Sequence, residues 1–291
     1  MKKSLLLEFV ALGAIWGSSF LFMRLCGPEF GVVATAGGRV AIAAAALAPV
    51  LWFSGQWHAL RDNAAALLML GLLNSAFPFA LFSYAVMSIS TGLSAILNAT
   101  APLFGTIILW VWLKERPART RIAGLLIGFA GVVALAADHA SFKPGGSGWA
   151  IVACLLASVS YGFSASYTRR YLTGVHPLAT ATGSQISATM ALIGPSIWLW
   201  PEHNPGPLAW LSMLALGLAC TALAYLLYFR LIAGLGPSRT ITVTFLIPVF
   251  AVAYGSGLLG EILTPWMLLC GAVVVLGTAL ATGVLTLSRR R

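Results

Sequence analysis

The stretch "LNATAPLFGTIILWVWLKE", from Leu97 to Glu115, has a proline within an apolar run and a glutamate at its end. A second stretch, "TFLIPVFAVAYGSGLLGE" from Thr244 to Glu261, has the same layout. Pro102 lies thirteen residues before Glu115, and Pro248 stands at the same distance from Glu261. Because proline lacks a backbone N–H and interrupts helices, this doubled pattern indicates a repeated, interrupted membrane helix.

The composition places the chain in a membrane. Of its 291 residues 59% are hydrophobic and only 8% are charged, whereas soluble domains carry about 25% charged residues. The four cysteines and four histidines form no metal-ligand cluster, and no nucleotide-binding or hydrolase motif occurs. We therefore expect a protein with many membrane spans, without a metal or other cofactor, without ATP-driven transport and without enzyme activity.

A bilayer-spanning helix needs about 20 apolar residues, and ten such segments follow one another with short polar linkers. The first begins "MKKSLLLEF", like a signal peptide. Glu8 interrupts it and no small-residue cleavage site follows, so we interpret it as a retained signal anchor. The predicted fold is an all-α membrane protein with helices at 5–25, 32–53, 65–87, 91–113, 119–137, 147–171, 178–200, 208–231, 238–259 and 266–287.

The basic residues predict the orientation. Ten spans place both termini on one side, and fourteen of the 17 Lys and Arg residues fall there. Only Arg24 and Lys143 fall on the other side, and Arg39 lies inside the second helix. Since cytoplasmic loops carry such an excess, we expect both termini in the cytoplasm and the protein in a bacterial inner membrane. The distribution also explains the net charge of +10 without a nucleic-acid partner.

The two opening stretches belong to a longer internal repeat. "IWGSSF" at 15–20 matches "SYGFSA" at 160–165, and "LFSYAV" at 81–86 matches "YLLYFR" at 225–230, with shifts of 145 and 144 residues. Each half, 1–143 and 144–291, then holds five helices. Because five is odd, the second half is inverted relative to the first, as in secondary transporters whose substrate site lies between the halves. A constant shift of 146 residues relates Pro102, Glu115 and Gly131 to Pro248, Glu261 and Gly277.

Several short motifs carry a family resemblance: "AIWGSSF" in the first helix, "GGR" in the second, "SYAV" in the third, and the endings "PLFGTIILWVWLKE" and "PVFAVAYGSGLLGE". With the five-plus-five arrangement they resemble the drug/metabolite transporter superfamily, and within it the ten-helix EamA type that includes the YddG-like amino-acid exporters. The resemblance covers nearly the whole chain. It implies a membrane carrier for small metabolites and does not specify the substrate.

Each internal proline leaves the carbonyl four residues earlier without its helical donor. The carbonyls concerned are those of Asn98, Thr244 and, through Pro78, Asn74. In lipid, an unpaired carbonyl costs several kcal/mol unless protein, water or ligand bonds to it. One interpretation is a packing kink satisfied by neighbouring hydroxyls or water. The other is that the breaks expose acceptors in a central cavity, and the sequence leaves both open.

Helical spacing suggests the residues that face this cavity. Trp16 and Ser19 recur in the second half as Tyr161 and Ser164, and Tyr84 coincides with Tyr228 under the repeat. Aromatic walls with neutral hydrogen-bonding groups suit amphipathic solutes such as neutral or aromatic amino acids. The alternative is that each ring belongs to the core or to an interfacial belt. The predicted substrate-binding set is Trp16, Ser19, Asn74, Phe77, Tyr84, Asn98, Tyr161, Ser164, Gln185, Tyr225 and Thr244.

Few ionisable residues fall within the spans. Arg39, a third of the way into the second helix, either holds a substrate carboxylate or bonds carbonyls near a helix end, and we favour the structural role. Glu115 and Glu261 are expected to bond turn N–H groups and the start of the next helix, and "LTPW" predicts Thr264 as an N-cap before Pro265. The predicted structural or gating set is Arg39, Pro78, Pro102, Pro248, Glu115 and Glu261.

The predicted function follows from these features and from the resemblance. Cation-exporting relatives use a glutamate in the first helix, where this chain has Trp16. Sugar-phosphate relatives need several basic groups in the cavity, and no lysine falls within the predicted cavity here. We expect an alternating-access exporter of small metabolites, with neutral or aromatic amino acids as the leading substrates and exchange or facilitated diffusion favoured over proton coupling. Other amphipathic metabolites or drugs, and a channel-like pore, are the alternatives. The expected partners are the substrate and the lipid bilayer, and the oligomeric state stays open.

Overall fold

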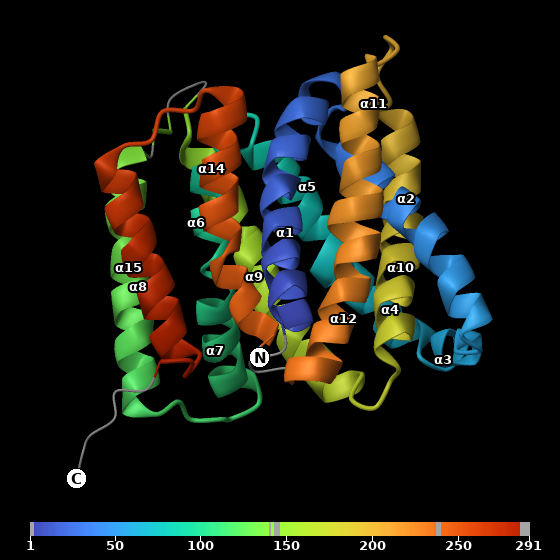
Figure 1. Cartoon of the computed structure of the whole chain (residues 1–291), viewed down its shortest axis with the longest axis horizontal. Coiled ribbons are helices and arrows are strands. Elements are labelled where there is room, and N and C mark those ends of the chain that lie inside the picture. The colour runs from blue at the N-terminus through green and yellow to red at the C-terminus, as the bar shows by residue number, and fades with distance from the viewer. Residues whose placement is uncertain (1–2, 140, 143–145, 237–239, 286–291) are drawn as a thin grey trace.

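The computed structural model describes residues 3–139, 141–142, 146–236 and 240–285, and over these ranges it contains helices and no strand. The first half of the chain forms α1 (Lys3–Phe30), α2 (Val32–Phe53), α3 (Trp57–Asp62), α4 (Ala64–Gly71), η1 (Leu72–Ala76), α5 (Phe77–Ala85), α6 (Thr91–Asn98), α7 (Ala101–Trp112) and α8 (Arg119–His139) (Figure 1). The second half forms α9 (Gly148–Tyr171), α10 (Pro177–Trp198), α11 (Pro207–Leu214), η2 (Ala215–Leu223), α12 (Ala224–Leu235), η3 (Ile241–Phe245), α14 (Ile247–Leu259) and α15 (Pro265–Ala281).

Helices occupy all ten predicted segments. Eight helical stretches of the described residues are long and apolar enough to cross a bilayer, among them the continuous runs 64–85, 91–112 and 207–235. The helix α15 is apolar but shorter, with 17 residues, and α10 has 22 residues with more serine, threonine and glycine. The outward surface carries apolar side chains such as Leu126, 69% exposed, and Trp198, 88% exposed, as a lipid-facing surface requires. The all-α membrane fold is therefore confirmed, and the structure is consistent with ten spans.

The helices of the two halves pack reciprocally. The second span of each half contacts its counterpart, α2 on α10, and so does the fifth, α8 on α15, which lie side by side at the left of Figure 1. The first span, α1, packs against α14 and against α11, η2 and α12. Its counterpart α9 packs in the same way against α6 and α7 and against α5. An inverted repeat predicts this exchange of partners.

Glycines permit the closest of these approaches. A Cβ atom on Gly277 in α15 would clash with the backbone of Gly128 in α8. A Cβ atom on Gly162 in α9 would lie 2.6 Å from the backbone nitrogen of Gly105 in α7. Small residues let membrane helices approach until their backbones touch. The glycine-rich faces of α8 and α15 thus find their neighbours within this chain.

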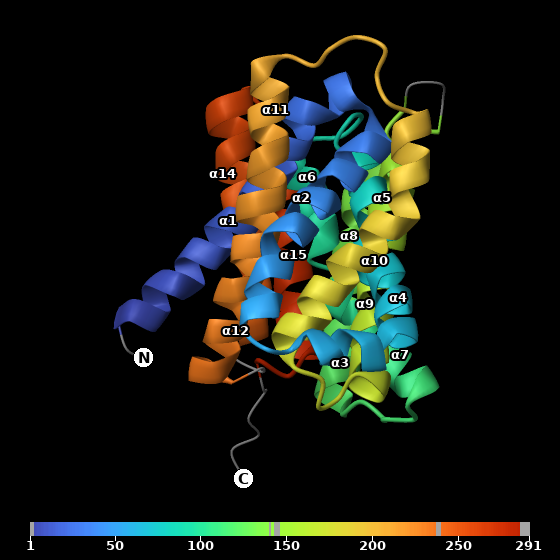
Figure 2. The ribbon, with the colours of Figure 1, turned by 90° about the vertical axis from the view of Figure 1, so that its right-hand side faces the viewer.

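The basic connections lie at one end of the molecule. The start of α1, the end of α15, α3, and the α7–α8 and α9–α10 connections all lie at the lower end in Figure 1. Figure 2 shows the first turns of α1 leaning away from the bundle, where Glu8 bonds Arg230 of α12 at 2.8 Å. The predicted half boundary at 143/144 lies outside the described residues, as do the basic positions Lys2, Lys143, Arg239 and 289–291.

Candidate functional site

A hydrogen-bonded network joins three spans inside the bundle. The Asn74 side-chain nitrogen, in η1, donates to the Tyr225 hydroxyl of α12 at 2.8 Å. The Ser164 hydroxyl of α9 donates to the Asn74 side-chain oxygen at 3.1 Å. Asn74 and Tyr225 are half-buried and Ser164 is buried. Three predicted site residues therefore meet, and they connect the first half of the chain to the second.

Aromatic rings flank this network in two equivalent pairs. Trp16 of α1 contacts Tyr228 of α12, with ring centres 5.4 Å apart. Tyr161 of α9 stacks on Phe82 of α5 at 6.0 Å. The repeat relates Trp16 to Tyr161 by 145 residues and Phe82 to Tyr228 by 146. Each pair therefore combines one ring from the first half with one ring from the second. In this packing the counterpart of Tyr228 is Phe82 rather than Tyr84.

Two long polar side chains anchor the π-helical segments η1 and η2. Arg39 of α2 donates from Nε to the Thr221 hydroxyl in η2 at 2.9 Å. Gln185 of α10 donates from Nε2 to the Ser75 hydroxyl in η1, also at 2.9 Å. A shift of 146 relates Arg39 to Gln185 and Ser75 to Thr221. Sequence reasoning missed this reciprocal pairing, although the shift already observed between Pro102 and Pro248 would have revealed it.

At the helix break beside Pro102, side-chain hydroxyls from other helices bond some of the backbone carbonyls. The helix α6 ends at Asn98 and α7 begins at Ala101. The Ser158 hydroxyl donates to the Leu97 carbonyl at 3.1 Å, and the Thr278 hydroxyl donates to the Ala99 carbonyl at the same distance. Among the described residues no donor reaches the Asn98 carbonyl between them, and Asn98 is half-buried. The packing-kink interpretation therefore holds for the Leu97 and Ala99 carbonyls, and exposure of the Asn98 carbonyl to a cavity stays a prediction.

The second break has the same property. At Pro248 the short 3₁₀-helix η3 meets α14, and the Thr244 hydroxyl turns back to the Ile241 carbonyl at 2.8 Å. Within the described part of the chain the Thr244 carbonyl also accepts no hydrogen bond. The two repeat-related prolines therefore each leave one acceptor unpaired, as their sequence positions predict.

Pro78 differs from the prediction. The five residues before α5 are π-helical, and the Phe77 N–H donates to Leu72, five residues earlier. In this register the carbonyl that lacks its donor because of Pro78 is that of Leu73 rather than Asn74. The Ser160 hydroxyl of α9 donates to it at 2.6 Å. The expectation for Asn74 was wrong because it assumed α-helical hydrogen bonds throughout the third span.

The same π-helical turn separates Phe77 and Tyr84 from the network. Their side chains are 49% and 41% exposed. In the described structure neither makes a hydrogen bond or ring contact with the cluster. A π turn adds a residue to the turn, so residues after it lose the helical phase of those before it. The face predicted from Asn74 therefore does not continue through Phe77 to Tyr84.

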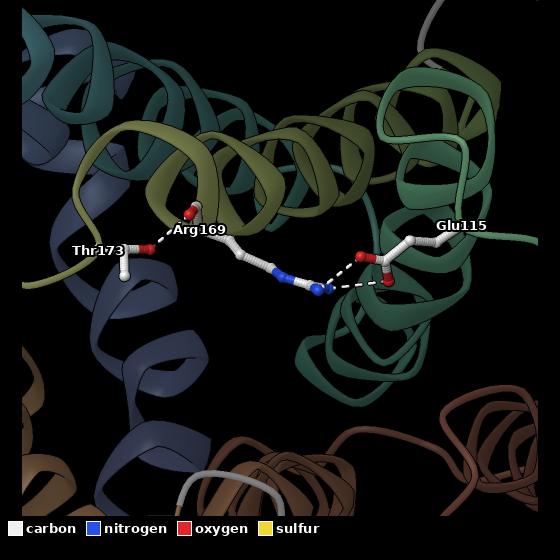
Figure 3. Close-up of polar contacts among 3 residues, drawn as sticks. All are labelled: Glu115, Arg169 and Thr173. Atoms are coloured by element: carbon white, nitrogen blue, oxygen red, sulfur yellow. Dashed lines mark hydrogen bonds and ion pairs between the residues drawn. The ribbon is translucent and has the colours of Figure 1, made fainter.

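The two repeat-related glutamates have different partners. Glu261 accepts hydrogen bonds from the Thr91 N–H at 2.9 and 3.0 Å and from its hydroxyl at 2.8 Å. Glu261 thus bonds the start of α6 rather than that of the next helix, α15. Glu115 pairs with the Arg169 guanidinium at 2.5 and 3.0 Å, in place of the expected turn N–H groups (Figure 3). Both partners were predicted wrongly because they lie far away in the sequence.

The predicted N-cap of α15 is confirmed. Thr264 caps α15 by accepting from the Met267 N–H at 3.1 Å, and Pro265 is the first helical residue, as predicted.

Two predicted site residues have polar atoms without a partner. Ser19 is buried and its hydroxyl has no partner in the described structure, and the same holds for the Gln185 side-chain oxygen. A surface hollow of about 600 Å³ lies apart from the network, beside α3, and is lined by residues such as His58, Asp62 and His176.

Two interlocked sets of membrane helices, joined by a polar and aromatic cluster, define a polytopic membrane protein of the transporter class. The chain belongs to the EamA-like transporter family, whose model matches residues 4–137 and again 148–283. The family assignment made from the sequence motifs is therefore confirmed, and the function is transport rather than catalysis.

Individual relatives agree with this assignment. A probable terminal-alkyne amino-acid exporter from Streptantibioticus cattleyicolor is 27% identical over 95% of this chain and 92% of its own length. The uncharacterized inner membrane transporter YedA of Escherichia coli is 27% identical over 94% of this chain and 88% of its own. A solved crystal structure covers 98% of both chains with a TM-score of 0.67 and 19% identity, which shows the shared fold.

Proposed function

We propose that this transporter is a secondary exporter of small metabolites, with neutral or aromatic amino acids as its leading substrates. The observation that carries the proposal is the network of Asn74, Ser164 and Tyr225 within the spans. With it go the carbonyls of Asn98 and Thr244, which accept no hydrogen bond from any residue that the structure describes. Groups that retain hydrogen-bonding capacity inside a membrane protein mark a substrate path, since they are costly elsewhere.

The chemistry of these groups fits a small amphipathic solute. The unpaired carbonyls accept hydrogen bonds from an ammonium group, and the rings of Trp16 and Tyr161 offer apolar faces and cation–π contacts. Reciprocal packing of the two halves supports alternating access, in which one half rocks against the other around a fixed site. One relative of similar length is named as an amino-acid exporter, which favours this substrate class over drugs and nucleosides.

The proposed setting is a bacterial inner membrane with both termini in the cytoplasm. Lys114, Arg116, Arg119 and Arg121 cluster on or beside the α7–α8 connection, at the end of the molecule where α1 begins. Such a concentration of basic residues is typical of the cytoplasmic face. The substrate and the surrounding lipid are the proposed partners, with no role for nucleic acid.

Reconstitution in liposomes tests the function directly. The purified protein is supplied with labelled amino acids, nucleosides and cationic drugs in turn. Saturable uptake of neutral amino acids, accelerated by unlabelled substrate on the opposite side, is the expected result. Uptake confined to nucleosides or drugs contradicts the substrate class, and steady conductance in a planar bilayer contradicts the carrier mechanism in favour of a pore. The variant Leu126→Ala, changed at an exposed apolar position of α8, serves as the matched control.

A further inference from the structure

Arg39 is a buried cation that makes no ion pair with any residue the structure describes. Its side chain lies within the α2 span and is 6% exposed. Among the described residues its side-chain contacts are the Thr221 hydroxyl, the Met23 sulfur and the Phe79 ring, and none of them is a carboxylate. Where the structure describes ion pairs, acidic side chains such as Glu8 and Glu115 bond to other arginines. A charge in this setting is costly unless a counter-charge joins it.

The repeat provides an internal comparison for this position. Gln185, the counterpart of Arg39, makes the equivalent hydrogen bond to Ser75 with a neutral amide. Holding a hydroxyl of the facing π-helical segment therefore requires only a side-chain N–H, which glutamine has. The positive charge of Arg39 is not explained by this packing role, so the sequence-based preference for a purely structural Arg39 is incomplete.

The geometry leaves part of the guanidinium available. Nε donates to Thr221 at 2.9 Å and the Phe79 ring covers one face, with the guanidinium carbon 3.8 Å from the ring centre. Of the two terminal nitrogens, Nη1 faces the weakly accepting sulfur of Met23 at 3.9 Å. Nη2 has no hydrogen-bond partner among the described residues. A guanidinium fixed in this way presents a planar pair of donors that matches a carboxylate.

We propose that Arg39 binds the carboxylate of the transported substrate, which restricts the carrier to small solutes with a single carboxylate. This inference rests on the proposed transport function. One guanidinium balances one negative charge, whereas a phosphate dianion would leave a charge uncompensated within the membrane. The Phe79 ring contacts the guanidinium, and its partner Thr221 lies four residues before Tyr225 of the Asn74 network, so the remainder of the solute meets rings and neutral polar groups.

The first test uses the wild-type protein in liposomes. Labelled substrate uptake is competed with a neutral amino acid, with its carboxamide and with its methyl ester, which keep the side chain and the amine but lack the carboxylate. We expect the free acid to compete at least tenfold better than either derivative. Equal competition by the acid and the derivatives overturns the assignment of Arg39, whatever the variants show.

The second test uses Arg39→Gln, which copies the side chain at the repeat-related position, and Arg39→Lys, which keeps the charge. We expect R39Q to elute as a folded protein and to lose at least tenfold in carboxylate uptake, with little change for the carboxamide, and R39K to retain intermediate uptake. Unchanged acid uptake in R39Q, or an equal loss for acid and carboxamide, overturns the proposal. If the wild type takes up other monocarboxylates but no amino acid, and R39Q loses that uptake, the role of Arg39 stands while the amino-acid assignment fails.

Discussion

Glu261 and Glu115 occupy equivalent places in the repeat, yet the structure predicts very different costs for removing them. Glu261 accepts from both the N–H and the hydroxyl of buried Thr91, at the first turn of α6. Hydrogen bonds to a charged group contribute about 1.5–3 kcal/mol each, and a carboxylate at a helix N-terminus adds about 0.3–1 kcal/mol. Because Glu261 is only half-buried, we expect its contributions to lie at the low end of these ranges. Glu261→Ala should therefore lower the free energy of unfolding by about 3 kcal/mol.

Glu115→Ala is the matched control for this prediction. Its ion pair with Arg169 has side chains that are 48% and 56% exposed, and exposed ion pairs contribute about 0–1 kcal/mol. The free energy of unfolding of both variants is measured by titration with SDS in mixed micelles. The prediction is a large loss for Glu261→Ala and a loss below about 1 kcal/mol for Glu115→Ala. Equal losses, or the reverse order, would refute the inference that Glu261, just after α14, stabilises the start of α6 through its hydrogen bonds with Thr91.

Three further substitutions test the packing and the network. Gly277→Leu should abolish recovery of folded protein on size exclusion, because a side chain there meets the backbone of α8. The control Gly257→Leu, with nothing within 4 Å of its Cβ position, should elute normally. Asn74→Ala should reduce liposome uptake about tenfold through two lost hydrogen bonds. Tyr84→Ala, at a 41% exposed ring outside the network, should stay near wild type, and the reverse ranking contradicts the site. Ser160→Ala should lower the free energy of unfolding by about 1–3 kcal/mol, because the half-buried Leu73 carbonyl in η1 loses its donor, and an unchanged SDS titration would refute that role.

Much of the fold is predictable because the bilayer imposes simple rules. Span length, polar linkers and basic loops follow from the thickness and charge of the membrane, and helices occupy every predicted segment. Local chemistry is predictable too: Thr264 and Pro265 begin α15 as their types indicate. The repeated prolines at 102 and 248 correctly marked the helix breaks, since the loss of an N–H depends only on the residue itself.

The rest depends on contacts that no local pattern contains. The π-helical turn in η1 changed which residues share a face, so Phe77 and Tyr84 fall outside the network that contains Asn74. The partners of Glu115 and Glu261 are separated from them by 54 and 170 residues, and helical spacing says nothing of such distances. The equivalence of the Arg39 and Gln185 hydrogen bonds could have been predicted from the sequence. A shift of 146 relates Arg39 to Gln185, and the same shift relates their hydroxyl partners Ser75 and Thr221.

The central claim is that the repeat-related breaks at Asn98 and Thr244 face a water-filled substrate path. Single cysteines at these positions, in a variant without the four native cysteines, are exposed in membranes to a water-soluble maleimide, with Leu126→Cys on the lipid-facing side of α8 as the control. Maleimides react with the thiolate, which needs water to form. We predict labelling of Asn98→Cys and Thr244→Cys that transported substrate suppresses, and none at position 126. Absence of labelling at both breaks, or labelling that substrate leaves unchanged, would contradict the claim.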